Sequence, residues 1–176
     1  QGLWAGPYLM DILNVSAIDT GNLLLVLNIG FIVGCPTAGY ISDRKMRSRK
    51  KAIICGLLMM GCSLAVLAMS KNGSLIWIGV MLFSLGFFSS FGQIMYAHIK
   101  ELMPSEISAT AMTGVNFFFF LGGAVFLHGF GSILSMDSLS SLGTSGRYTA
   151  GFFLCCLTIF FGAIIYYTTK ESNVEL

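Results

Sequence analysis

Long apolar stretches alternate with short polar joints along this chain of 176 residues. From one charged joint to the next there are five apolar segments, each near or above the roughly 20 residues that a helix needs to cross a bilayer. The predicted spans are 20–42, 52–70, 74–99, 106–134 and 148–169. Turn and cap residues fill the joints between them. The pattern predicts an all-α, polytopic membrane helix bundle.

The opening stretch QGLWAGPYLM predicts the outer end of a further, partial span over residues 1–11. At about 1.5 Å per residue, ten residues cover only half of a hydrocarbon core of about 30 Å. Gln1, Trp4 and Tyr8 stand at i, i+3 and i+7 and share one helix face. We interpret Gln1 and Trp4 as facing a solute pathway, and Tyr8, beside Pro7, as a residue of the membrane interface.

Composition supports a membrane protein, because 55% of the residues are hydrophobic and only 10% are charged, against roughly 25% charged residues in a soluble domain. The five cysteines lie in apolar runs without CxxC spacing or a histidine partner, so we interpret them as small apolar side chains. His98 and His128 lie near opposite ends of different spans, which favours interfacial or capping roles. The sequence indicates no cofactor and no metal site.

The basic residues gather on one side of the predicted spans. Lys100 and Lys170 fall on the same side as the basic joint 43–51, whereas Lys71 and Arg147 fall on the other. By the positive-inside rule, the joint and the C-terminus are cytoplasmic. A basic patch for anionic lipid or nucleic acid stays open as an additional role. Topology alone explains the charge, however, and we expect the lipid bilayer but no nucleic acid as a partner.

The basic joint is preceded by a glycine and an acid, in the stretch GYISDRKMRSRKK at 39–51. Gly39 is expected to let helices approach closely. Asp43 lies at the end of a helix, where the helix dipole is negative, so its carboxylate needs a partner elsewhere. Either an arginine of the joint or the N-terminus of another helix could supply one. The candidate arginines are Arg44, Arg47 and Arg49.

This stretch resembles the cytoplasmic loop signature of the major facilitator superfamily, whose secondary transporters have twelve helices in two six-helix halves. The matching residues are Gly39, Ser42, Asp43, Arg44, Arg47 and Arg49. Met46 stands where the signature usually has a second glycine. The segment 104–126 is similar to the penultimate helix of the C-terminal half, with Ala-Thr-Ala at 109–111 in place of the usual GTA-type start. The resemblance implies half of a twelve-helix fold, from the end of helix seven through helix twelve.

The resemblance also implies a gate and a partner. In this family the loop acid docks against helix ends of the opposite half as part of the cytoplasmic gate. Asp43 and its loop are therefore expected to act in gating. The expected partner is an N-terminal six-helix half, which either was lost from this sequence or is supplied by another chain. We expect an integral protein of a bacterial cytoplasmic membrane. In the family, helices seven and ten line the cavity, and eight and eleven flank it. The segments 74–99 and 106–134, which would be helices ten and eleven, carry more hydrogen-bonding groups than 52–70 and 148–169, in agreement with this order.

Polar side chains within the spans are the candidate solute contacts. Ser89, Gln93 and Tyr96 recur at i, i+4 and i+7 and make one polar face. An amide in lipid must face protein or water, so each such group either binds solute or bonds a neighbouring helix. The expected contacts are Gln1, Trp4, Asn28, Ser89, Gln93, Tyr96 and Asn116. The phenylalanines 117–120 circle their helix and are interpreted as packing residues.

No Asp, Glu, Lys or Arg lies centrally in any predicted span. This half therefore offers neutral hydrogen bonds and aromatic surface, and any charged groups for proton coupling or anion binding are expected in the missing half. Gly30 with Gly34, and Gly122 with Gly123, are expected to allow close helix packing.

Two functional hypotheses follow. The first is a secondary active transporter, present here as a C-terminal fragment, that moves a small polar solute by alternating access. The alternative is a self-contained membrane scaffold of five or six spans, or a subunit of a larger complex. An enzyme is not expected, because no catalytic dyad or metal cluster lies at one depth.

Overall fold

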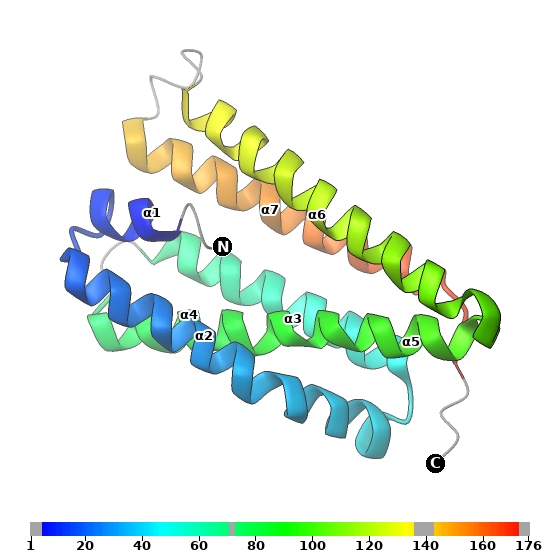
Figure 1. Cartoon of the computed structure of the whole chain (residues 1–176). Coiled ribbons are helices and arrows are strands. Elements are labelled where there is room, and N and C mark those ends of the chain that lie inside the picture. Colours follow the sequence, from blue (N-terminus) through cyan, green and yellow to red (C-terminus); the bar gives the residue numbers. More distant parts are fainter. Residues whose placement is uncertain (1–4, 71–72, 136–142, 173–176) are drawn as a thin grey trace.

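The computed structural model describes residues 5–70, 73–135 and 143–172, and these residues fold into helices without a strand. The chain is thus all-α, as the sequence predicts. In order, the elements are α1 (Ala5–Asp11), α2 (Ala17–Tyr40), the π-helix η1 (Ile41–Met46), α3 (Arg49–Met69), α4 (Leu75–Ser89), the 3-10 helix η2 (Ser90–Gln93), α5 (Ile94–Leu102), α6 (Ser105–Ser135) and α7 (Gly143–Tyr167) (Figure 1).

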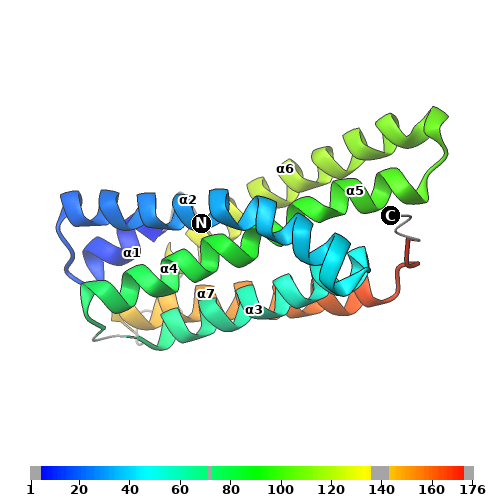
Figure 2. The same ribbon diagram turned by 90° about the horizontal axis from the view of Figure 1, so that it is seen from below.

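Five continuous helical rods in the described residues are long and apolar enough to cross a membrane. They run over 17–46, 49–69, 75–102, 105–132 and 143–167. Several rods reach a few residues beyond the apolar segments seen in the sequence, because a charged residue in a terminal helical turn ends the apolar stretch without ending the helix. Figures 1 and 2 show these rods as one elongated bundle.

The basic joint 43–51 is mostly helical, which corrects its description as a loop. η1 continues α2 through Met46, and α3 begins at Arg49, so only Arg47 and Ser48 link the two helices. Arg47 turns the chain with φ of 47°. Ser48 is the N-cap of α3, and its hydroxyl oxygen accepts a hydrogen bond from the Lys51 amide at 3.0 Å. A good cap thus starts the next helix at once.

Close contact between α2 and α4 organises the bundle. A Cβ on Gly30 would lie 2.3 Å from the Phe83 carbonyl oxygen, and one on Gly86 would lie 2.0 Å from the Leu27 carbonyl oxygen. A Cβ on Gly34 would lie 2.4 Å from the Ser90 hydroxyl oxygen. The predicted packing role of Gly30 and Gly34 is confirmed, since only glycine fits at these approaches.

Three other glycines do not act as predicted within this chain. Gly122 and Gly123 on α6 have no atom within 4 Å of an added Cβ, and the same holds for Gly39. The expectation of close packing at these positions is wrong for contacts inside the described residues. A small residue permits close approach but does not supply the neighbouring helix.

The core lies between α1, the paired helices α2 and α4, and the pair α3 and α7. Tyr8 is buried there, with its ring centre 4.8 Å from that of Phe152, so it faces neighbouring helices. Its place at the depth of the membrane interface stays a prediction. α6 contacts only the helices beside it in sequence strongly, α5 and α7, and the phenylalanines 117–120 are all exposed. This long apolar helix is left with most of its surface uncovered by the described chain.

We predict that Gly86→Ala destabilises the protein by about 1–3 kcal/mol, because the new methyl group forces α2 and α4 apart. The matched control is Gly162→Ala on α7, where nothing lies within 4 Å of an added Cβ. Thermal unfolding of the full-length protein in detergent measures the stability of both variants. Equal effects of the two substitutions would contradict the α2–α4 contact.

Candidate functional site

A hydrogen bond joins α5 to α6 at the polar face predicted from the sequence. The Tyr96 hydroxyl donates to the Asn116 Oδ1 atom at 3.0 Å. Tyr96 is half-buried and Asn116 is exposed. The bond uses one side of the Asn116 amide, and its NH₂ group makes no hydrogen bond within the described part of the chain. The pair therefore presents unused donors beside an aromatic ring.

Gln93 lies at the same depth as Asn116. It stands nine residues before the end of α5 at Leu102, and Asn116 stands eleven residues after the start of α6 at Ser105. Because the two helices are joined directly by a short turn, each residue is about 15 Å from that turn. The Gln93 side chain is exposed. Gln93 is thus an exposed amide within an apolar rod, and it makes no side-chain hydrogen bond among the residues that the structure describes.

The 3-10 segment η2, which ends at Gln93, changes the helix register there, and the sequence did not indicate it. Ser90 is buried, and its hydroxyl donates to the Phe87 carbonyl oxygen at 2.6 Å. The Ser89 hydroxyl donates to the Gly86 carbonyl oxygen at 2.7 Å, so it remains available only as an acceptor. A short 3-10 stretch inside a long helix often marks a hinge.

The remaining predicted contacts lie apart from this face. Asn28 on α2 is exposed, and its Nδ2 donates to the Leu24 carbonyl oxygen at 2.8 Å, which leaves its side-chain oxygen as an acceptor. Gln1 and Trp4 fall outside the described residues. The structure thus brings Tyr96 and Asn116 together, with Gln93 at their depth, and holds Asn28 on another helix.

The predicted gating residues lie at the other polar region, the charged end of the bundle. Arg49 forms an ion pair with Asp43, so one of the arginines considered from the sequence is its partner. The same guanidinium binds Glu101 of α5 through Nη2 at 2.8 Å and Nε at 3.0 Å. Its Nη1 also donates to the buried Ser42 hydroxyl at 3.3 Å. Arg49 therefore ties together η1, α3 and α5.

Glu101 was not identified from the sequence. Its signal is weak, since it is a single acid at the end of a span, on the side that carries the basic joint. Arg44 and Arg47 are exposed, and neither forms an ion pair within the described ranges. Only Arg49, of the three candidate arginines, has a fixed electrostatic role inside this half.

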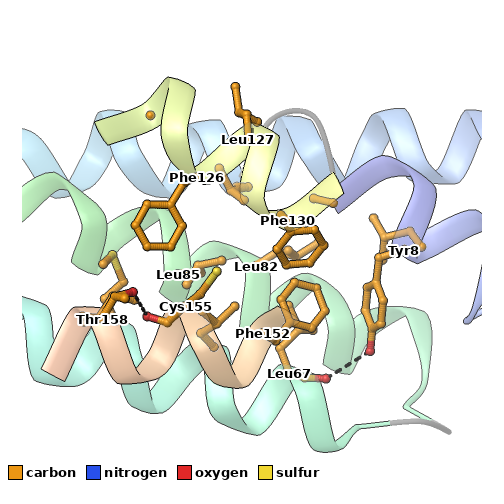
Figure 3. Close-up of a pocket in the computed structure, with 17 residues that line it drawn as sticks. Tyr8, Leu67, Leu82, Leu85, Phe126, Leu127, Phe130, Phe152, Cys155 and Thr158 are labelled. Atoms are coloured by element: carbon orange, nitrogen blue, oxygen red, sulfur yellow. Dashed lines mark hydrogen bonds between the residues drawn. The ribbon is translucent and has the colours of Figure 1, made fainter. Parts of the chain in front are cut away.

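An apolar cavity of about 730 Å³ lies inside the bundle, between α1, α3, α4, α6 and α7 (Figure 3). None of the predicted binding residues lines it. Its polar groups are already engaged, because the Tyr8 hydroxyl donates to the Leu67 carbonyl oxygen at 3.4 Å and the Thr158 hydroxyl donates to the Cys155 carbonyl oxygen at 2.8 Å. These hydroxyls remain available only as acceptors, so a polar solute would replace few of the hydrogen bonds that it makes to water.

Comparison with known proteins gives one family. The family model described as Major Facilitator Superfamily matches residues 2–175. The chain is 27% identical over 174 residues to the glycerol-3-phosphate transporter of Bacillus subtilis (strain 168), covering 97% of this chain and 38% of that protein. The fold is similar to that of the xylose transporter XylE from E. coli in an inward-open conformation, with a TM-score of 0.66 and 21% identity. That match covers 96% of this chain and 43% of the other, so this chain spans less than half the length of both.

We predict that Glu101→Gln destabilises the charged end more than Asp43→Asn does. Arg49 holds Glu101 through two nitrogens, and the Glu101 side chain is 28% exposed against 41% for Asp43. The expected costs are about 2 and about 1 kcal/mol, which thermal unfolding in detergent measures. A larger loss for Asp43→Asn would contradict the assignment of Glu101 as the main partner.

Proposed function

The chain belongs to the major facilitator superfamily, and we propose that it is the C-terminal half of a secondary active transporter that carries a small polar solute by alternating access. The observation that supports this most is the polar face of α5 and α6. Tyr96 on α5, Asn116 on α6 and Gln93 at the end of η2 present neutral donors and acceptors within apolar rods. Such groups in a membrane bundle favour a solute pathway.

The solute-binding surface proposed here is formed by Gln93, Tyr96 and Asn116, with Ser89 as an acceptor next to them. Gln93 and Asn116 are exposed in this half, so they are available to a ligand or to another helix bundle. Asn28, Gln1 and Trp4 remain proposed contacts from other parts of the half. All seven are neutral side chains, which suits hydroxyl and carbonyl groups of a solute.

The charged end is proposed to act in gating. There Arg49 holds Asp43, while Arg44 and Arg47 remain exposed for contacts with the other half. Gly39 precedes this end and has open space around it. In an alternating-access cycle, such a charged end forms and breaks contacts between the two halves as they rock around the central site.

The proposed setting is a bacterial cytoplasmic membrane, with the basic joint and the C-terminus on the cytoplasmic side. Arg44, Lys45, Arg47 and Lys51 are exposed at one end of the bundle, where the positive-inside rule places cations. The proposed partner is an N-terminal six-helix half. Both relatives named above are more than twice the length of this chain, which supports a partner half of similar size.

We predict that Gln93→Ala and Asn116→Ala each raise the KM for the transported solute about 5–20-fold, because each removes a hydrogen bond to the ligand. Thermal-shift measurements on the full-length protein with xylose, glycerol 3-phosphate and a panel of sugars and polyols identify a solute. Uptake into proteoliposomes then gives KM. The control is Ser84→Ala, whose hydroxyl donates only to its own helix at the Val80 carbonyl oxygen, 2.9 Å away. An unchanged KM in both variants would refute the binding surface.

A separate prediction concerns orientation. In a full-length protein whose native cysteines are replaced by alanine, Lys45→Cys should react with a membrane-impermeant maleimide only after cell lysis. Lys71→Cys should react in intact cells, because the two lysines lie on opposite sides of the predicted spans. The reverse labelling pattern would show that the proposed topology is inverted.

A further inference from the structure

The residues that follow α7 lie at the charged end and bind the start of α3. Glu171 is the main contact. Its Oε2 accepts a hydrogen bond from the Ser48 hydroxyl at 2.7 Å, and its Oε1 accepts one from the Lys50 amide at 3.3 Å. A carboxylate is favoured at a helix N-terminus, where the dipole is positive. Residues 121 positions apart in the chain are thereby joined.

A second anchor comes from Lys50 itself. Its ammonium group donates to the Thr169 carbonyl oxygen at 2.9 Å and lies 4.8 Å from the centre of the Tyr167 ring. The ammonium therefore combines a charge-assisted hydrogen bond with a cation–π contact. Both contacts hold the end of α7 and the residues that follow it against α3.

His98 of α5 supplies the third anchor. It is 1% exposed, and its Nε2 lies 3.1 Å from the Lys170 carbonyl oxygen. A carbonyl oxygen only accepts, so Nε2 carries the hydrogen and donates it. In the neutral ring Nδ1 is then an acceptor, and the Tyr166 hydroxyl beside it donates to it. The imidazole thus bonds to Tyr166 near the end of α7 and to Lys170 just after it.

Glu171 thus binds both sequence neighbours of Arg49, Ser48 through its hydroxyl and Lys50 through its backbone amide. We propose that the segment Tyr166–Ser172 is a latch, and that Glu171 is a positioning residue that holds Arg49 in place to bridge Asp43 and Glu101. The latch joins α3, α5 and α7 at the charged end into one unit. The proposal does not depend on the solute or on the transport cycle.

The role goes beyond capping α3. The helix already has its own cap, since the Ser48 hydroxyl accepts from the Lys51 amide at 3.0 Å. Glu171 instead binds the Ser48 hydroxyl and the Lys50 amide, on either side of the arginine. Arg49 must direct one guanidinium to two carboxylates on different elements. A planar fork of this kind binds well only when its backbone is held in one position.

A double-mutant cycle on the full-length protein in detergent tests the proposal. Glu171→Gln is expected to lower the midpoint of thermal unfolding by about 2 °C. In an Arg49→Met background the same change should have less than half this effect, because no bridging arginine is left to position. If the two losses simply add, Glu171 only caps α3 and the proposal is overturned.

Hydrogen exchange supplies a second readout. In Glu171→Gln the amides of η1, which Glu171 does not touch, should exchange at least about threefold faster, because Asp43 loses its fixed partner. Glu171→Asp, which keeps the charge, should restore part of this protection. The control is Glu106→Gln in the first turn of α6, whose carboxylate accepts a hydrogen bond from the Ser105 hydroxyl at 3.0 Å and forms no ion pair with Arg49 within the described residues. Faster exchange confined to residues 48–51 would overturn the latch, and so would equal effects of Glu171→Gln and Glu106→Gln on η1.

Discussion

Direct backbone contact between α2 and α4 sets the position of most other elements. In lipid no hydrophobic force drives apolar helices together, so association depends on close packing and on hydrogen bonds. Gly30 and Gly86 provide that packing by removing the side chains that would stand between the two backbones. Gly34 gives Ser90 a place next to α2, and Ser90 begins the 3-10 turn that leads into α5. The locations of Tyr96 and His98 thus follow from glycines on α2 and α4.

Polar groups in the described chain separate into two regions by their cost in a membrane. Most charged groups gather at one end, where contacts of Arg49 and His98 join η1, α3, α5 and the end of α7. Neutral amides and hydroxyls lie deeper, at Gln93, Tyr96 and Asn116. This order is expected, because an ionised side chain costs far more in hydrocarbon than a neutral one. A rigid charged end and an uncharged middle therefore coexist in the same helices.

The sequence predicted what depends on local composition. Apolar length located the spans, the period of small residues identified Gly30 and Gly34, and the position of Asp43 at a helix end indicated that it needed a partner. It did not indicate Glu101 or Glu171, since their partners lie 52 and 121 residues away and no local pattern records such pairs. Nor did it indicate that Tyr8 packs inside the bundle, where α7 brings Tyr148 and Phe152 against it. Gly122 and Gly123 show the converse, a packing pattern whose neighbour the described chain does not contain.

The apolar cavity and the polar face of this half suit ligands of different chemistry. The cavity of about 730 Å³ is lined by apolar side chains and by hydroxyls already bonded to main-chain oxygens, so it suits apolar groups. The polar face at Gln93 and Asn116 has donors to spare but no wall opposite it in the described residues. A solute held there by one face alone would keep much of its hydration and bind weakly. Under the proposed function, solute recognition therefore needs a second surface across from α5 and α6, which the proposed partner half around a central site would provide.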